Sequence, residues 1–200
     1  MREINESWFR YINHLGIEYP FLNNIFVFFA EYTVLFLALF VIFLWFKRTS
    51  EGRKKVIVGV LAFLFAYVTG HLVGFFHFNY QPFIEMENVN QLIEKRANNS
   101  FPSDHTILFF SFCVSFWLFH KRNVFWLVLA VLGGASRIGV GVHYPFDVIV
   151  GATIAIIYAL IFYYVVPKSF LIQKSLTYYE NLEKKIWRSS KSRNNKDIDL

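Results

Sequence analysis

The chain has 200 residues, of which 56% are hydrophobic and 20% aromatic, and its formal net charge is +6. The hydrophobic residues form blocks about as long as the roughly 20 residues that a helix needs to cross a bilayer. This excludes an ordinary soluble domain and favours a helical protein that crosses the membrane several times. In such a protein basic residues indicate orientation before they indicate an acidic partner, so we expect no nucleic-acid binding.

The first segment, residues 1–20, mixes charged and apolar side chains. Ile4, Trp8, Phe9 and Ile12 recur at helical spacing among acidic and basic residues. This pattern is typical of an amphipathic helix that lies in the membrane interface. It does not fit a cleavable signal peptide, because the segment carries acids and no apolar core.

Five apolar runs follow, and each is expected to form a membrane-crossing helix. They cover residues 21–46, 56–78, 105–120, 124–142 and 146–166. The sequence therefore predicts an all-α membrane bundle over residues 21–166, with a polar segment at 79–104 and a basic tail at 167–200. Cys113, the only cysteine, excludes a disulfide within the chain.

The basic residues predict the orientation of these helices. Five crossings place the 47–55 loop, the 120–123 turn and the tail on one side of the membrane. The basic residues of that side are Lys47, Arg48, Arg53, Lys54, Lys55, Lys121, Arg122 and those of the tail. Fewer lie on the other side, namely Arg2, Arg10, Lys95, Arg96 and Arg137. The positive-inside rule then places the C-terminus in the cytoplasm, with the N-terminus and the 79–104 segment facing outward.

Polar and ionisable residues gather where four apolar runs reach the outward face. In chain order they are Gln81, Ser103, Asp104, His105, Ser136, Arg137, His143 and Asp147. Ionisable groups at membrane depth are unfavourable unless they pair or line a polar cavity. We therefore expect these four segments to converge on one site.

These residue types suit phosphoryl transfer. Ser103 is placed as the N-cap of a helix, whose free N–H groups can bind an anion. Arg137 offers a planar fork that matches phosphate oxygens. Of the two histidines His105 and His143, one can attack phosphorus while the other protonates the leaving oxygen. Asp147, four residues after His143, can orient that ring.

Each of these residues also has a structural interpretation. His105 could be an interfacial histidine, Asp147 a residue favoured by the dipole at a helix start, and Arg137 a side chain that snorkels to the interface. Four such coincidences at one end of the bundle are less plausible than one active site. Glu31, inside the first run, is either functional or paired with Tyr32 or an interfacial group.

The motifs resemble those of a known family. Ser136-Arg137, His143 and Asp147 match the SR-x5-H-x3-D motif of the type 2 phosphatidic acid phosphatases. The residues from Pro102 to His105 match that family's PSGH element with Asp in place of Gly. The resemblance covers roughly residues 20–166, and the PSDH variant looks like the bacitracin-resistance type of undecaprenyl-diphosphatase.

The resemblance implies a role for each site residue. His143 would be the phosphohistidine nucleophile, Asp147 its orienting partner and His105 the general acid. The residues expected to bind the substrate phosphate are Arg137, Ser103, Asp104, Gln81 and Ser136. The family uses neither metal nor cofactor, and we expect none here.

One family motif is altered in this chain. The family has K-x6-RP, whereas this sequence has Gly74 and Gln81-Pro82 at the corresponding places. Gln81 can donate hydrogen bonds but carries no charge, and charge-assisted bonds are stronger. His77, Lys95 and Arg96 are the candidates for the missing positive charge.

By this resemblance the chain is expected to hydrolyse undecaprenyl diphosphate at the outer face of a bacterial cytoplasmic membrane. The monophosphate product would be reused as a cell-wall lipid carrier, and bacitracin resistance would follow because that antibiotic binds the diphosphate. Two alternatives stay open: a broad phosphatase of phosphatidic acid and phosphatidylglycerophosphate, and a non-catalytic binder of prenyl diphosphates or subunit of an export system. The sequence does not set the oligomeric state.

Overall fold

The computed structural model describes the backbone of residues 2–196 and the side chains of residues 2–186. Residues 197–200 of the predicted basic tail lie outside the described residues. The described part is helical and contains no strand. Two short elements carry the label η, and the first of them is a π-helical turn and the second a 3-10 turn. In chain order the elements are α1 (Arg2–Glu18), α2 (Phe21–Val27), η1 (Phe28–Tyr32), α3 (Thr33–Phe46), α4 (Ser50–Phe76), α5 (Pro82–Glu85), α6 (Asp104–Phe119), α7 (Phe125–Gly139), α8 (Pro145–Val165), η2 (Val166–Lys168) and α9 (Phe170–Lys196).

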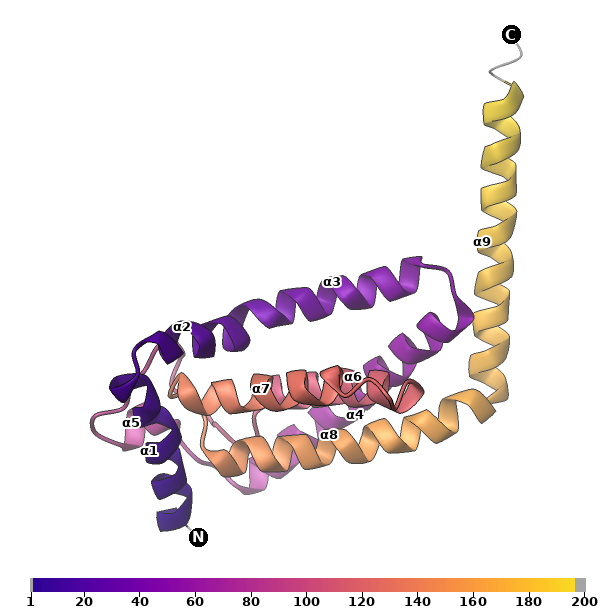
Figure 1. The fold of residues 1–200 in the computed structure, drawn as a ribbon. Helices are drawn as coiled ribbons and strands as arrows, with labels where there is room; N and C mark the ends of the chain where they lie inside the picture. The colour runs from indigo at the N-terminus through magenta and orange to yellow at the C-terminus, as the bar shows by residue number, and fades with distance from the viewer. Residues whose placement is uncertain (1, 197–200) are drawn as a thin grey trace. The chain divides into compact units, whose positions relative to one another are not determined.

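The chain divides into two compact units, Met1–Tyr163 and Tyr164–Leu200. In the first unit, α3, α4, α6, α7 and α8 run side by side, while α1, α2 and α5 lie at one end of these helices (Figure 1). In the second unit, Pro167 lies in η2, and the side-chain amide of Gln173 donates to the carbonyl of Val166 at 2.9 Å before α9 continues.

The all-α membrane fold predicted from the apolar runs is confirmed, with small shifts of the helix bounds. By length and composition, three described helices can span a membrane, Phe21–Phe46, Ser50–Phe76 and Pro145–Lys168. The other two apolar helices, α6 and α7, are shorter, with 16 and 15 residues. The second predicted run starts late, at 56, because charged side chains fill the first turns of α4. That helix begins at Ser50, where the hydroxyl of Thr49 accepts from the N–H of Gly52.

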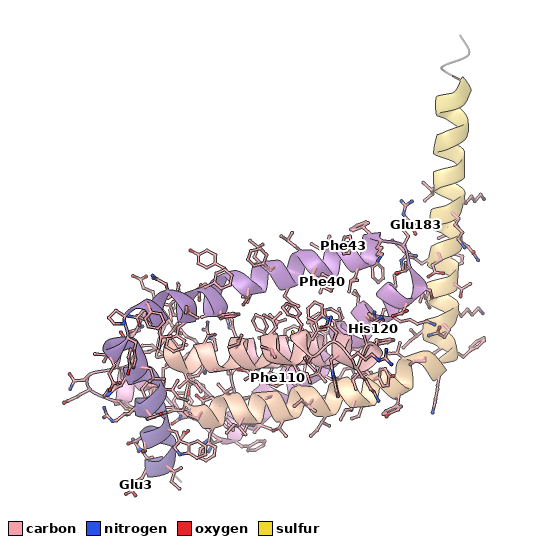
Figure 2. The ribbon with its side chains drawn as sticks, viewed as in Figure 1. Glu3, Phe40, Phe43, Phe110, His120 and Glu183 are labelled. Atoms are coloured by element: carbon pink, nitrogen blue, oxygen red, sulfur yellow. The ribbon has the colours of Figure 1, made fainter. Side chains whose placement is uncertain are left out.

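Helix α6 lies at the centre of the bundle. Its side chains enter the core cluster shared with α3, α4 and α7 and the cluster shared with α4 and α8. Aromatic rings fill the first cluster, which includes Phe40 on α3 (Figure 2). The ring centroid of Phe40 lies 4.8 Å from that of Trp126 and 5.5 Å from that of Phe116.

The amphipathic N-terminal helix packs one face onto the end of the bundle. Phe9 and Asn13 are buried, and the ring of Phe9 lies 5.6 Å from that of Tyr144. The side chain of Asn13 donates to the carbonyls of Asn90 and Gly139, each at 3.0 Å, and accepts from the N–H of Asn90. Helix α1 therefore connects the 86–103 segment, which lies between α5 and α6, to the end of α7.

Candidate active site

Three of the four predicted motif segments meet through backbone contacts, at the end of the bundle where α1 and α5 lie (Figure 1). The N–H of Ser103, before α6, donates to the carbonyl of Asp147 in α8 at 3.1 Å. The N–H of His143 donates to the carbonyl of Arg137 at 3.3 Å. Helix α8 approaches the start of α6 closely at Gly151, where a Cβ would lie 3.0 Å from the carbonyl oxygen of Ser103. The start of α6, the end of α7 and the start of α8 are thus directly connected.

A tight turn between α7 and α8 carries His143. Gly141 has a φ of +84°, a conformation that glycine adopts without strain. A Cβ there would also lie 2.8 Å from the carbonyl oxygen of Asn90. The N–H of Leu92 donates to the carbonyl of Val140 at 3.2 Å, so the 86–103 segment rests directly on this turn.

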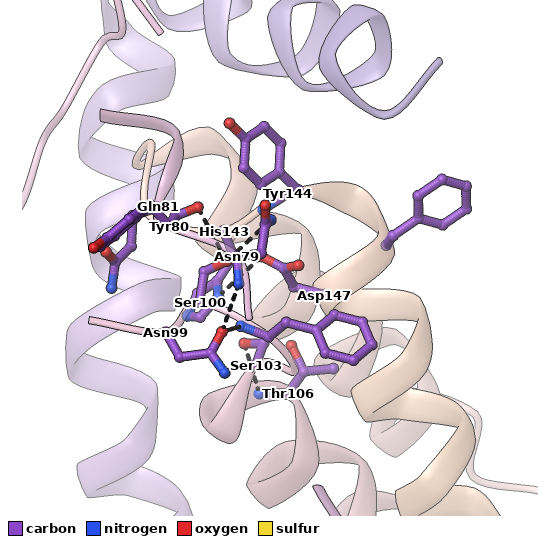
Figure 3. A network of polar contacts seen from close by, with 12 residues as sticks. Asn79, Tyr80, Gln81, Asn99, Ser100, Ser103, Thr106, His143, Tyr144 and Asp147 are labelled. Carbon is purple, nitrogen blue, oxygen red and sulfur yellow. Dashed lines mark hydrogen bonds and ion pairs between the residues drawn. The ribbon is translucent and has the colours of Figure 1, made fainter. Parts of the chain in front are cut away.

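His143 and Asp147 form a buried pair. The Nδ1 atom of His143 lies 3.5 Å from Oδ2 of Asp147, and the two side chains are 3% and 1% exposed. The same Oδ2 accepts the N–H of Tyr144 at 2.9 Å, which fixes the carboxylate in the first turn of α8 (Figure 3). The helical spacing of four residues therefore places the carboxylate against one ring nitrogen, as expected.

Lys95 occupies the other side of the ring. Its Nζ lies 2.8 Å from Nε2 of His143. Because an ammonium group has only donors, Nε2 must accept this bond and carry the lone pair. The ring proton then sits on Nδ1, facing Asp147. This is the tautomer that a nucleophilic Nε2 requires.

Burial and nearby charge shift the pKa values of both groups. Burial lowers the pKa of Lys95 to about 8, and the neighbouring Arg137 acts in the same direction, while Asp104 and Asp147 oppose the shift. Burial also places the pKa of His143 well below its ordinary value, helped by Lys95 and Arg137. At neutral pH the Lys95 side chain is therefore a cation and His143 a neutral imidazole.

Arg137 is held by the first membrane-spanning segment. Its Nη1 donates to the carbonyl of Ala30 at 3.1 Å and lies 3.5 Å from Oε1 of Glu31. Both contacts come from the π-helical turn η1, and such turns occur frequently at functional sites. The Arg137 side chain is 3% exposed, and its buried Nε has no hydrogen-bond partner among the described residues. One N–H donor of the guanidinium is therefore not used by the protein.

The remaining predicted site residues lie around this centre. Ser103 is the N-cap of α6, as predicted, with its hydroxyl accepting from the N–H of Thr106 at 3.5 Å. His105 is half-buried on the first turn of α6. It is close enough to Arg137, His143 and Lys95 for electrostatic interaction with them.

Other predicted phosphate-binding residues have protein partners. The hydroxyl of Ser136 donates to the carbonyl of Gly133 at 2.8 Å. Asp104 is exposed, with one carboxylate oxygen 3.9 Å from Nδ1 of His71. Among the described residues, no group of three or more His, Cys, Asp or Glu side chains is placed to hold a metal ion.

The buried Gln81 binds the 86–103 segment. Its Oε1 accepts the N–H of Asn98 at 3.0 Å, and its Nε2 donates to the side-chain oxygen of Asn98 and, at 3.4 Å, to the carbonyl of Arg96. Gln81 thereby connects the start of α5 to the chain that carries Lys95.

Polar residues of 79–100 extend this network (Figure 3). The side chain of Asn99 accepts from the N–H of Asn79 and donates to the carbonyl of Gly74 at 2.8 Å. The N–H of Ser100 donates to the carbonyl of Asn79 at 2.7 Å. A Cβ at Gly74 would lie 2.5 Å from the carbonyl oxygen of Phe101, so no larger residue fits at position 74 without a backbone shift.

Two cavities of the first unit lie at the starts of α8 and α6, and of the buried pair only Asp147 lines one of them. One, of about 430 Å³, is lined by residues that include Asp147, His77 and Phe146. The other, of about 520 Å³, includes Asp104 and the aromatic side chains of Phe75 and Phe78. Polar and aromatic groups line both, which suits a ligand with a charged head and an apolar chain.

Comparison with known proteins identifies the family. The sequence model of the PAP2 superfamily matches residues 60–171, which contain His105, Arg137, His143 and Asp147. The chain belongs to the PAP2 superfamily. It is therefore a membrane lipid phosphatase of that family, in agreement with the motifs.

PAP2 relatives support this assignment along most of the chain. The "Bacitracin transport permease protein BcrC" of Bacillus licheniformis is 47% identical over 97% of this chain and 96% of its own length. The "Undecaprenyl-diphosphatase BcrC" of Bacillus subtilis (strain 168) is 32% identical over 80% of this chain and 83% of its own. The crystal structure of Aquifex aeolicus LpxE superposes with a TM-score of 0.67 at 32% identity, covering 81% of this chain and 96% of that one.

Two residues of the site, Lys95 and Glu31, had no role assigned from the sequence. Lys95 was one of three candidate cations, and the structure places it against His143, the expected nucleophile. For Glu31 the sequence suggested Tyr32 or an interfacial group as partner, whereas the structure places it beside Arg137. The intramembrane position of Glu31 was the only signal for it, whereas the polar 79–104 segment gave no signal that singled out Lys95.

Proposed function

We propose that this protein hydrolyses undecaprenyl diphosphate to undecaprenyl phosphate and inorganic phosphate through a phosphohistidine at His143. The observation that carries the proposal is the buried imidazole, with Asp147 facing Nδ1 and a cation bound to the Nε2 lone pair. The Bacillus subtilis relative is named as an undecaprenyl-diphosphatase, which supports the choice of lipid.

The reaction would take two steps. The lone pair of Nε2 attacks the terminal phosphorus, a P–N bond forms, and the P–O bond to the bridging oxygen breaks. His105 gives its proton to the departing lipid phosphate, and Asp147 stabilises the positive charge on the His143 ring. Water then attacks the phosphohistidine, the P–N bond breaks, and His105 accepts a proton from that water.

Phosphate binding is assigned to the surrounding donors. Arg137 would bind the phosphate through the N–H that the protein leaves unpaired, together with the N–H groups at the start of α6. Ser103, Asp104, Ser136 and Gln81 are retained as further phosphate-binding proposals. The bonds that the Ser136 hydroxyl and the Gln81 side-chain N–H groups donate within the protein would have to be released for direct contact with substrate.

We further propose that the site faces outward in a bacterial cell membrane. The basic 47–49 and 120–124 turns lie at the end of the bundle opposite to α1 and α5 (Figure 1). The positive-inside rule makes that end cytoplasmic. Hydrolysis at the outer face would return the lipid carrier to use and remove the diphosphate that bacitracin binds, which would confer resistance.

Phosphate release from detergent-purified protein tests the reaction. We expect wild type to act faster on undecaprenyl diphosphate than on phosphatidic acid or phosphatidylglycerophosphate, with no effect of a chelator, and His143→Ala to be inactive. Faster hydrolysis of the glycerolipids would instead favour a broad lipid phosphatase. Absence of release from every lipid would contradict the enzymatic proposal.

The name of the Bacillus licheniformis relative favours one alternative, a subunit of a bacitracin exporter. A cellular comparison separates the two. Resistance that depends on hydrolysis is lost in cells that express His143→Ala at the wild-type level. Resistance retained by that variant would favour export.

A further inference from the structure

Lys95 lies on a segment that is fixed on both sides. Before it, the N–H of Leu92 is bonded to the carbonyl of Val140. After it, Gln81 bonds to the carbonyl of Arg96 and to Asn98. Because these contacts hold the backbone, the half-buried Lys95 side chain reaches the site from a defined anchor.

The ammonium of Lys95 occupies the place where a reacting phosphorus must arrive. Its Nζ is 2.8 Å from Nε2 of His143, along the lone pair that would form the P–N bond. The ammonium and a phosphorus atom cannot both use this lone pair. The lysine must therefore leave Nε2 before any attack, and its flexible four-carbon stem allows a short displacement.

The surroundings favour a phosphate oxygen as the next partner of this ammonium. The charged and titratable groups that face Lys95 are Asp104 and His105 of α6, Arg137 of α7, His143 of the following turn and Asp147 of α8. Asp147 and Arg137 already have partners in the protein, at Tyr144 and at Glu31. A diphosphate placed at Nε2 would bring several anionic oxygens within reach of the displaced ammonium.

We propose that Lys95 is a phosphate-binding residue, whose ammonium moves from the lone pair of His143 onto a non-bridging phosphate oxygen when the substrate binds. The move frees Nε2 for attack and screens the negative charge of the phosphate from the nucleophile. This proposal rests on the proposed function, in which His143 attacks a lipid diphosphate. It also gives the site a second cation beside Arg137, where Gln81 supplies none.

Substitution of Lys95 tests the proposal against a matched neighbour. We expect Lys95→Met to lower kcat/KM for undecaprenyl diphosphate roughly 100-fold, as loss of one charged donor at a reacting centre does. Lys95→Arg keeps the charge and should stay within about tenfold of wild type. The control is Glu94→Gln, which removes an exposed charge from the same segment and should leave kcat/KM within about twofold of wild type.

The pH profile adds a readout that a structural role would not move. The pKa of Lys95 is lowered to about 8, so its charge is present below that pH and lost above it. In wild type, kcat/KM should therefore decline above about pH 8. This decline should be absent in Lys95→Met and shifted to higher pH in Lys95→Arg. An unchanged alkaline limb in both variants overturns the proposal.

Failure of the proposal and failure of the proposed function give different results. If wild type hydrolyses the lipid and Lys95→Met retains wild-type kcat/KM, the role of Lys95 is refuted while the enzyme stands. If wild type releases no phosphate, a second measurement applies. Binding of orthovanadate, a phosphate analogue, is then measured as the increase in Tm that it causes. Orthovanadate should stabilise wild type and Glu94→Gln more than Lys95→Met, and equal stabilisation of all three overturns the proposal.

Discussion

At the scale of single residues, the environment of one imidazole decides what the site can do. His143 has a carboxylate facing one nitrogen and an ammonium on the other, so its tautomer follows from its neighbours. The PAP2 motif made the first contact predictable, because residues four apart lie on one face of a helical turn. The second contact could not be predicted, since it joins residues 48 positions apart through an irregular segment.

The role of Asp147 gives a prediction at this scale. In Asp147→Asn, the side-chain oxygen can still accept the N–H of Tyr144, so the turn should keep its structure. The charge that holds the Nδ1 proton is lost, and an amide N–H facing Nδ1 would favour the wrong tautomer. We expect kcat to fall roughly 1,000-fold or more, in line with the loss of the orienting carboxylate in other histidine-based sites.

Steady-state kinetics with undecaprenyl diphosphate check this expectation. KM should change little, because Asp147 faces Nδ1 of His143, whereas the phosphate is proposed to meet Nε2. Glu87→Gln, an exposed acid on the 86–103 segment, serves as the control. A variant with wild-type kcat would show that Asp147 does not orient the nucleophile.

At the scale of secondary-structure elements, the first spanning segment does more than cross the membrane. The run 21–46 was predicted as one uninterrupted helix, and the structure contains a π-helical turn at Phe28–Tyr32. That turn places the carbonyl of Ala30 and the side chain of Glu31 against Arg137. A π-helical turn leaves no pattern in a continuous apolar run, so the sequence could not predict it.

Removal of the Glu31 charge tests this contact. Glu31→Gln keeps the shape of the side chain but loses the ion pair with Arg137, while the Ala30 carbonyl still holds the guanidinium. Because the Glu31 side chain is 49% exposed, the effect should be modest. We expect KM to rise by about three- to tenfold with kcat nearly unchanged. An unaltered KM would mean that Glu31 does not position Arg137.

At the scale of the whole molecule, the sequence was most informative about the membrane depth at which the ends of the helices lie. Each motif lies at the end of an apolar run, and alternating crossings bring such ends to the same depth. The convergence of His105, Arg137, His143 and Asp147 was therefore predictable. The path of 79–104 was not, because buried residues from distant segments, such as Asn13 and Gln81, fix it.

The orientation can be tested on intact bacterial cells. Cys113 is buried, so an engineered cysteine can be followed separately. We expect a membrane-impermeant thiol reagent to label Glu87→Cys, on the exposed part of the 86–103 segment, but to label Arg122→Cys only after the cells are lysed. The reverse pattern would place the site on the cytoplasmic side.

The central claim, that Nε2 of His143 attacks phosphorus, is tested most directly by trapping the intermediate. Purified enzyme is mixed with undecaprenyl diphosphate that carries radioactive phosphorus at its terminal phosphate, quenched rapidly in alkali and digested. We expect acid-labile, alkali-stable label on the peptide that contains His143, and none in His143→Gln. Phosphate release at the wild-type rate by His143→Gln, or label on a different residue, would contradict it.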